Sequence, residues 1–274
     1  MVSVAVAGGT GGVGRTIVEA LNRSRHKAFV FSRKPLEGDF YDNPNITTIT
    51  VDYTKVDSLV RILETYRIHT VICAFSVSGD SLSRSQANLI EAAKLSEETK
   101  RFVPSSFAIQ YPREAVKDLP QLKDYFAAIE TLRRSDLKFT VFHNGIFLDY
   151  FIPSETRLES YLRPNVFVID IANKVAAIPG DGNAPLPSRC KFRVHYDPIE
   201  KLENFEITEL PGHRALYEHF PKDRFRWFMA IFELFTVDGR SRLGRKGSSN
   251  ERLPEVIPVT VRNVIGAWKD ELSG

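Results

Sequence analysis

The stretch Val2-Ser-Val-Ala-Val-Ala-Gly-Gly-Thr-Gly-Gly-Val-Gly14 decides the fold that we expect for this chain. Its first residues have the apolar character of a buried strand, and apolar residues then recur at helical spacing from Val13 to Leu21. The glycines therefore form a turn between a strand and a helix. Such a turn needs glycine to reverse tightly, to let a pyrophosphate approach the backbone, and to pack the helix close to the sheet. Because a helix N-terminus also attracts phosphates, the stretch predicts a dinucleotide site. The alternative is a tight turn that holds no ligand.

Strand-like and helix-like segments alternate through the first half of the chain. The expected strands cover residues 2–7, 28–31, 46–51, 70–75, 101–104 and 139–143. The helical patterns between them cover 13–21, 59–66, 85–95 and 120–135. Thr54-Lys-Val-Asp57 resembles a capping box at the start of the second helix. This alternation predicts an α/β fold with a doubly wound, Rossmann-like parallel sheet.

The alternation stops near residue 150. Residues 166–171 still have the pattern of a strand, 224–235 are strongly apolar and aromatic, and 261–272 have the pattern of a closing amphipathic helix. We therefore expect an NAD(P)-binding Rossmann domain over 1–150 and a smaller, mixed lobe over 151–274 for a substrate or a partner.

Composition narrows the class of protein. The 274 residues are 43% hydrophobic and 26% charged, with a formal net charge of +3, which is typical of a soluble globular protein. The balanced charge gives no reason to expect nucleic acid, and no apolar stretch is long enough to span a membrane. Cys73 and Cys190 stand in no CxxC motif and the histidines have no metal-like spacing, so we expect neither disulfides nor a metal site. No targeting segment is visible, and we expect a cytoplasmic protein.

The residues after the second expected strand select the cofactor. An acidic side chain there binds the 2′-hydroxyl of NAD, whereas an arginine accommodates the 2′-phosphate of NADP. This chain has Phe31-Ser-Arg-Lys34 and no acid at that position. Arg33, with Lys34 beside it, predicts a preference for NADP(H). NAD(H) is the alternative if both side chains are solvated loop cations.

Four stretches together resemble a known family. They are Gly8 to Gly14, Gln86 to Lys94, Lys100-Arg-Phe-Val-Pro-Ser-Ser-Phe107 and Asn144-Gly-Ile-Phe-Leu-Asp-Tyr150. On these residues the chain is similar, over nearly its whole length, to the NmrA-like and isoflavone-reductase-like proteins, which are atypical short-chain dehydrogenases/reductases. The third stretch is the most specific, since the family pattern is close to KRFxPSxF.

The resemblance implies further contacts with a cofactor. The loop from Ala74 to Ser76 would pass along it, Gln86 would reach it from the following helix, and Ser105 to Phe107 would lie near the nicotinamide. The alternatives are that Phe75 and Phe107 belong to the core and that Gln86 is a surface residue. The expected cofactor-binding residues are Gly8, Thr10, Gly11, Gly12, Val13, Gly14, Arg33, Lys34, Ala74, Phe75, Ser76, Gln86, Ser105, Ser106 and Phe107.

One departure from the family concerns the proton donor. The reductases of this family carry a lysine on the helix after the fifth strand, and alignment places Tyr125 at that position. Tyr125 borders the inward face of the helix, whereas Lys123 lies about 200° around it. Tyr125 is therefore the candidate catalytic acid. Ile129 stands where a Tyr-x-x-x-Lys pair would have its lysine, which favours the alternative of a packing residue.

A second departure follows the turn-rich loop from Pro179 to Pro187. Relatives continue there with a strand and a helix, whereas Ser188 to Phe192 lead directly into Arg193-Val-His-Tyr-Asp-Pro-Ile-Glu200, which resembles a later part of the family. We expect that roughly forty residues are missing near residue 190 and that the C-terminal lobe is incomplete. Because the lost part would cover apolar surface, we expect a lower thermal midpoint than that of a full-length relative. An equal midpoint would contradict this.

Two functions are consistent with these residues. The first is an NADPH-dependent, isoflavone-reductase-like oxidoreductase of a small apolar or aromatic molecule, in which the cofactor supplies the hydride chemistry. The second is a non-catalytic sensor that binds NADP(H) or NAD(H) and regulates a protein partner, as NmrA-type proteins do. The missing lysine motivates this alternative. A folded but inactive remnant is the third.

Overall fold

The computed structural model describes residues 1–36, 38, 43–76, 81–152, 160–162, 165–181, 192–218, 220–244, 248–257 and 259–272. These residues form two compact units. The first unit comprises 1–108, 113–144 and 160–162, and the second comprises 109–112, 145–159 and 163–274. The division at residue 150 expected from the sequence stays a prediction.

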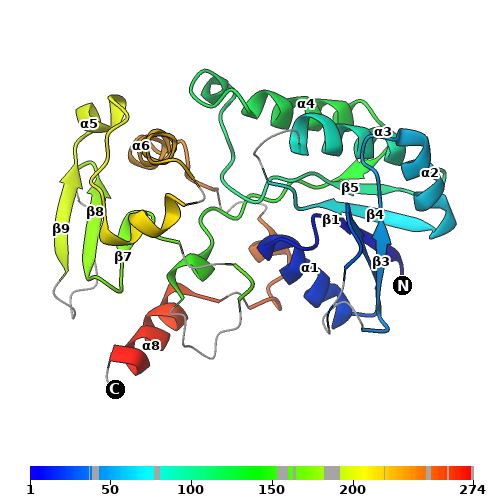
Figure 1. Cartoon of the computed structure of the whole chain (residues 1–274), viewed down its shortest axis with the longest axis horizontal. Coiled ribbons are helices and arrows are strands. Elements are labelled where there is room, and N and C mark those ends of the chain that lie inside the picture. The colour runs from blue at the N-terminus through cyan, green and yellow to red at the C-terminus, as the bar shows by residue number, and fades with distance from the viewer. Residues whose placement is uncertain are drawn as a thin grey trace. The chain divides into compact units, whose positions relative to one another are not determined.

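The first unit is built on a six-stranded parallel sheet in the order β3-β2-β1-β4-β5-β6 (Figure 1). Its strands are β1 (Ser3–Ala7), β2 (Lys27–Ser32), β3 (Ile46–Thr50), β4 (Ile68–Cys73), β5 (Arg101–Val103) and β6 (Lys138–Phe139). The predicted doubly wound parallel sheet is confirmed. The sixth strand is shorter than expected, and an isolated parallel bridge between Ala108 and His143 follows it.

Helices cover both faces of this sheet, with α1 on one face and α2, α3 and α4 on the other (Figure 1). They are α1 (Gly12–Asn22), α2 (Val56–Thr65), α3 (Ala87–Leu95) and α4 (Leu122–Arg133). A π-helical turn, η2 (Leu82–Gln86), precedes α3, and a 3₁₀ turn, η3 (Arg113–Val116), precedes α4. The layers follow from the strand periodicity, because alternate side chains of a strand point to opposite faces. Val6 packs in one cluster with Val18 of α1. Phe31 packs in another with Leu59 of α2 and Leu89 of α3.

The predicted capping box at α2 is wrong. The helix begins at Val56 with Lys55 as its N-cap residue, and no side chain caps it. Instead, Asp52 accepts hydrogen bonds from the backbone N–H of Thr54 at 2.9 Å and from its hydroxyl at 2.6 Å. A short polar side chain that bonds the backbone two residues on forms an alternative local turn, and this turn engages Thr54 before the helix starts.

The second unit contains a smaller mixed sheet, as predicted. Its strands are β7 (Ile169–Asp170), β8 (Val175–Pro179) and β9 (Arg193–Asp197), in that order, with β7 antiparallel and β9 parallel to β8. Its helices and turns are η4 (Leu148–Phe151), α5 (Ile199–Glu203), η5 (Pro211–Leu216), α6 (Lys222–Val237), α7 (Ser249–Arg252) and α8 (Val261–Leu272). The aromatic stretch expected at 224–235 is α6, whose Phe225 and Met229 pack with Leu202 of α5.

The connection between β8 and β9 contains the site of the expected deletion. These parallel neighbours are joined by only 13 residues, 180–192. A parallel connection needs about a dozen residues or more and usually includes a helix, so this connection is near the minimum. Most of the predicted turn-rich loop, Cys190 and the junction at 188–191 lie outside the described residues.

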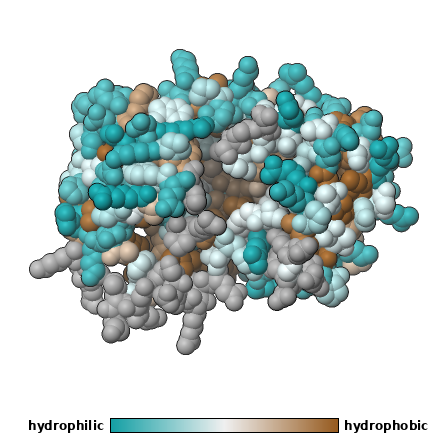
Figure 2. All heavy atoms as spheres, viewed as in Figure 1, coloured by the Kyte–Doolittle hydropathy of each residue, from teal (hydrophilic) through white to brown (hydrophobic). Residues whose placement is uncertain are grey.

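Among the helices that the structure describes, none is long and apolar enough to cross a membrane. In the space-filling view, hydrophilic side chains cover much of the visible face and hydrophobic ones form smaller brown patches (Figure 2). The described residues contain no group of three or more side chains that could hold a metal ion.

Candidate cofactor site

The glycine turn lies where the strand order of the sheet reverses. β1 is flanked by β2 and β4, and the carboxyl ends of β1 and β4 meet where the N–H of Ala74 donates to the carbonyl of Ala7 at 2.8 Å. Gly8 follows β1 with a φ of +82°, and a Cβ there would lie 2.6 Å from the carbonyl oxygen of Ala74. Ligands of open α/β sheets bind at such a reversal, outside the carboxyl ends of the strands.

Of the other two glycines of the motif, the fold requires Gly14 but not Gly11. A Cβ on Gly14 would lie 2.1 Å from the carbonyl oxygen of Gly8, so only glycine allows α1 to pack this close to the turn. A Cβ on the exposed Gly11 would meet only that same oxygen, at an ordinary 3.6 Å. Gly11 also has a φ of −79°, which any residue adopts, so the fold itself does not require glycine there. The open space above Gly11 and the uncapped N-terminus of α1 fit a pyrophosphate.

A short segment that we did not predict packs on the first turn of α1. A Cβ on Gly12 would lie 2.8 Å from the carbonyl oxygen of Tyr161 and 3.1 Å from Cα of Leu162. The guanidinium of Arg15 lies 4.5 Å from the centre of the Tyr161 ring, which is a cation–π contact. The segment 160–162 thus lies beside the turn although it is far from it in sequence. No local pattern in the sequence signals this contact.

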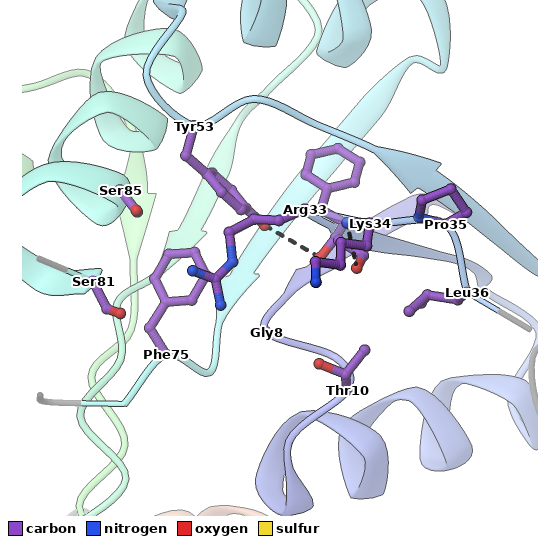
Figure 3. A pocket seen from close by; sticks show the side chains of 12 residues that line it. Gly8, Thr10, Arg33, Lys34, Pro35, Leu36, Tyr53, Phe75, Ser81 and Ser85 are labelled. Carbon is purple, nitrogen blue, oxygen red and sulfur yellow. Dashed lines mark hydrogen bonds between the residues drawn. The ribbon is translucent and has the colours of Figure 1, made fainter. Parts of the chain in front are cut away.

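A cavity of about 740 Å³ opens beside the turn (Figure 3). Five of its lining residues belong to the expected set: Gly8, Thr10, Arg33, Lys34 and Phe75. The remaining lining residues, absent from that set, are Phe31, Ser32, Pro35, Leu36, Tyr53, Ser81 and Ser85. None of the described lining residues is acidic, so the two cations give this end of the cavity a positive charge.

Tyr53 and Phe75 form an aromatic corner of the cavity. Their ring centres are 5.2 Å apart and the rings are perpendicular. The Tyr53 hydroxyl donates to the carbonyl of Phe31 at 3.2 Å, and burial raises the pKa of this phenol, so it stays protonated. Figure 3 shows the Arg33 side chain extending toward the Phe75 ring, below Tyr53. Tyr53 comes shortly after β3, and its position at the carboxyl edge of the sheet is the signal that could have identified it.

The loops after β4 and β5 are joined by hydrogen bonds. The N–H of Ser105 donates to Oε1 of Gln86 at 2.7 Å, and the Ser105 hydroxyl donates to the carbonyl of Phe75 at 2.7 Å. Gln86 is fully buried, so it is not the surface residue that the alternative interpretation supposed. Its Nε2 has no acceptor among the described residues, and buried donors are rarely left unpaired in native proteins. Of the other expected residues, Ser76 is exposed and Ala74 is half-buried.

Tyr125 lies on the inward face of α4 and is only 4% exposed. The Ser106 hydroxyl donates to the Tyr125 hydroxyl at 3.4 Å. Burial, the largest effect, raises the pKa of this phenol, whereas the Ser106 hydrogen bond lowers it. Tyr125 is therefore protonated at neutral pH and is a weaker acid than a free tyrosine. Lys123 is exposed on the same helix, as predicted. Phe107 is half-buried and stacks on Phe142, with ring centres 6.2 Å apart.

Known proteins are similar in sequence to this chain. The NAD(P)H-binding domain family matches residues 8–165, which is more than half of the chain. This chain belongs to that family. It is 35% identical to the oxidoreductase BOA1 of Botryotinia fuckeliana, over 94% of this chain and 96% of that protein. It is 28% identical to the eugenol synthase 1 of Petunia hybrida, over 66% of this chain and 58% of that protein.

Solved structures share the fold. A leucoanthocyanidin reductase from Vitis vinifera superimposes with a TM-score of 0.69 at 14% identity, over 97% of this chain and 99% of that one. This chain is an NAD(P)H-binding oxidoreductase related to the isoflavone-reductase-like enzymes. The resemblance noted in the sequence is thus confirmed.

The comparison with BOA1 also bears on the missing segment. The alignment spans 298 positions but includes only 94% of the 274 residues of this chain, so about 40 positions of the relative face gaps. This number agrees with the expected size of the deletion. Its placement near residue 190 stays a prediction.

Proposed function

We propose that this chain is a reductase that prefers NADP(H) to NAD(H). The observation that carries the proposal is the cavity beside the glycine turn, which Arg33 and Lys34 line together and which has no described acidic residue in its wall. A 2′-phosphate pairs with such cations, whereas a free 2′-hydroxyl gains little from them.

The proposed binding mode assigns a role to each part of the site. The N-terminus of α1 would hold the pyrophosphate above Gly11, and Arg33 with Lys34 would hold the 2′-phosphate. The loops at 74–76 and 105–107 would line the nicotinamide side, where the unpaired Nε2 of Gln86 is a donor for the cofactor. The cofactor supplies a hydride when bound, and the protein orients it and excludes water.

A titration tests the cofactor preference. We expect the wild-type protein to bind NADPH at least about tenfold more tightly than NADH, since a charge-assisted phosphate contact contributes on that scale. The double variant Arg33→Ala, Lys34→Ala should raise the Kd of NADPH about tenfold or more and leave the Kd of NADH within twofold of the wild-type value. Lys123→Ala, which removes an exposed cation on α4, is the matched control. Equal affinities of the wild-type protein for the two cofactors would refute the preference.

For the substrate we propose a small apolar or aromatic molecule, with Tyr125 as the proton donor. The names of the relatives support the first part, since they include a eugenol synthase and an isoflavone-reductase-like protein. The protonated state of Tyr125 and its contact with Ser106 support the second. We expect oxidation of NADPH with some member of a panel of carbonyl and enone compounds, and loss of that activity in Tyr125→Phe.

A second function is favoured by one observation. Tyr125 is buried, has a raised pKa, and stands where the reductases of the family have a lysine. A non-catalytic protein that senses NADP(H) or NAD(H) and binds a regulatory partner would retain the cofactor site and have no proton donor. It predicts tight NADPH binding with no turnover on the whole panel. Appearance of turnover in Tyr125→Lys would instead identify the scaffold as a disabled enzyme.

We also propose that the protein acts in the cytoplasm. Cys73 is a free, buried thiol, and free thiols are typical of a reducing compartment. Fractionation of cells that express the tagged protein tests this, and recovery in a secreted or organellar fraction would contradict it.

A further inference from the structure

Two side-chain amides at the start of α3 are each hydrogen-bonded to a loop that borders the cofactor site. Oε1 of Gln86 accepts from the N–H of Ser105 at 2.7 Å, and Nδ2 of Asn88 donates to the carbonyl of Tyr53 at 2.8 Å. Residues two positions apart on a helix point about 200° away from each other. The two amides therefore reach loops on different sides of the helix.

Gln86 bonds to the loop after β5, and Ser105 of that loop bonds in turn to the loop after β4. It is fully buried, and it is the last residue of the π-helical turn that precedes α3. Such turns are rare, and many occur at functional sites. Ser105, which donates its N–H to Gln86, also donates its hydroxyl to Phe75, so one chain of hydrogen bonds joins these three residues.

Asn88 bonds to the loop after β3, on the side of Arg33. It holds the backbone of Tyr53, whose ring meets Phe75 edge-on and whose hydroxyl donates to the carbonyl of Phe31. Phe31 precedes Ser32 and Arg33 at the end of β2. Asn88 thus supports the wall that carries the cations for the 2′-phosphate.

We propose that Gln86 and Asn88 are positioning residues for opposite ends of the cofactor. Gln86 sets the backbone of the two loops on the nicotinamide side, through Ser105 and the carbonyl of Phe75. Asn88 sets the wall on the adenosine side through Tyr53, whose ring meets the ring of Phe75. The first turns of α3 thereby fix the spacing between the two walls. This inference rests on the proposed binding of NADP(H).

Two probes separate the two ends. Adenosine 2′,5′-bisphosphate occupies only the adenosine side, and NADPH occupies both, with a nicotinamide whose fluorescence reports its surroundings. We expect Gln86→Met to leave the Kd of the bisphosphate within twofold, raise the Kd of NADPH about tenfold, and abolish the fluorescence gain of bound NADPH. An unpaired amide accounts for a loss of this order. Asn88→Leu should raise the Kd of both probes about equally, by about five- to tenfold, and retain the fluorescence gain at saturation.

Further variants keep the result interpretable. Gln86→Glu retains an acceptor for Ser105 and should retain the fluorescence gain at saturation, whereas the loss of the Nε2 donor should still raise the Kd of NADPH. Ser105→Ala removes only the hydrogen bond to the carbonyl of Phe75 and should raise the Kd of NADPH about threefold. This variant tests the inference if Gln86→Met does not fold. Asn204→Ala, which removes an amide bond to the carbonyl of Glu200 in the second unit, is the matched control and should change neither Kd.

Two results would overturn the inference. If Gln86→Met also raises the Kd of both probes alike, and both variants lose affinity in parallel with their thermal midpoints, the two amides only stabilise the fold. If the wild-type protein binds neither probe, the proposed function fails and the inference fails with it. If the wild-type protein binds both probes and Gln86→Met retains the full fluorescence gain of bound NADPH, the inference is refuted and the proposed function stands.

Discussion

The two units of this protein differ in the kind of polar side chain that they bury: neutral ones in the first unit, and mostly acidic ones in the second. In the first unit the large core cluster around the sheet is apolar, and the polar residues of the candidate site stand near the carboxyl ends of the strands. Among the described residues of the second unit, four charged or titratable side chains are buried: Asp170, Asp197, His213 and Glu233. The first unit is therefore specified mainly by hydrophobic periodicity, and the second also depends on specific polar contacts.

Asp197 is the centre of one such network. It is fully buried at the end of β9 and accepts from the Thr208 N–H at 2.7 Å, from the Thr208 hydroxyl at 2.6 Å and from Nζ of Lys201 at 2.7 Å. These donors replace the water that a buried carboxylate loses, so its oxygens are all hydrogen-bonded.

His213 and Asp170 form a second network. The N–H of Leu210 donates to Nδ1 of His213 at 3.2 Å, so the ring proton is on Nε2, which lies 2.9 Å from the carbonyl oxygen of Phe167. Burial, the largest effect, lowers the pKa of His213 and keeps it neutral. Asp170 accepts from the N–H of Gly212 at 2.8 Å. These bonds hold η5 against residues more than 40 positions earlier in the chain.

The largest expected effect on stability is that of Gly14→Ala in the first unit, in contrast to Gly11→Ala. Gly14→Ala should prevent the first unit from folding, because the new Cβ would lie 2.1 Å from a backbone oxygen. Gly11→Ala should leave the urea midpoint unchanged and abolish NADPH binding. Circular dichroism in urea and a fluorescence titration measure the two effects. A Gly14→Ala protein with the wild-type midpoint would break the contrast.

In the second unit, we expect stability to depend on pH through Glu233. Burial and the nearby Asp197 raise the pKa of Glu233 from 4.5 to about 8, against the opposing charge of Lys201. A raised acid pKa means that the stabilisation is complete below pH 4.5 and is lost as pH rises toward 8. The free energy of unfolding should fall by up to about 1.4 kcal/mol per pH unit in that interval. Glu233→Gln should remove this slope in urea titrations at several pH values, and an unchanged slope would assign it to another group.

A smaller effect is expected for Asp197→Ala. The change removes the acceptor of Lys201 and of Thr208 and should cost about 2–3 kcal/mol, since Lys201 remains partly exposed to water. NADPH affinity should stay within twofold if the contrast between the units holds. Glu200→Ala, an exposed carboxylate on α5, is the control for charge alone. A loss of NADPH affinity without a change in the urea midpoint would show that the contrast is too simple.

The smallest effect on stability is expected for Tyr125→Phe. Its hydroxyl is 3.4 Å from that of Ser106, which is long for a hydrogen bond, so the cost should be below about 1 kcal/mol. Any reductase activity should nevertheless fall much more than the thermal midpoint. Activity and midpoint that decline together would make Tyr125 a packing residue.

Local patterns predicted most of the first unit. The six strands, the helices between them and the place of the glycine turn all follow from periodicity and from glycine spacing, which are properties of short segments. The predicted capping box at Thr54 is wrong because Asp52, only two residues earlier, accepts the hydrogen bonds of Thr54 in a local turn. A pattern of residue types does not show which of two such local hydrogen bonds forms. In the second unit, the helix Val261–Leu272 was predicted correctly because its apolar stripe is regular. The strand predicted at 166–171 is longer than the observed β7, which has only two residues.

The sequence by itself determined the sheet, the glycine turn and the two cations after β2, because each depends on residues close together in the chain. Only the tertiary structure decided that Tyr53 and Phe75 form one corner, that Tyr161 packs on Gly12, and that Gln86 faces inward. The physical reason is that parallel strands bring their following loops to one edge of the sheet. Which side chains meet there depends on packing between segments that are tens of residues apart.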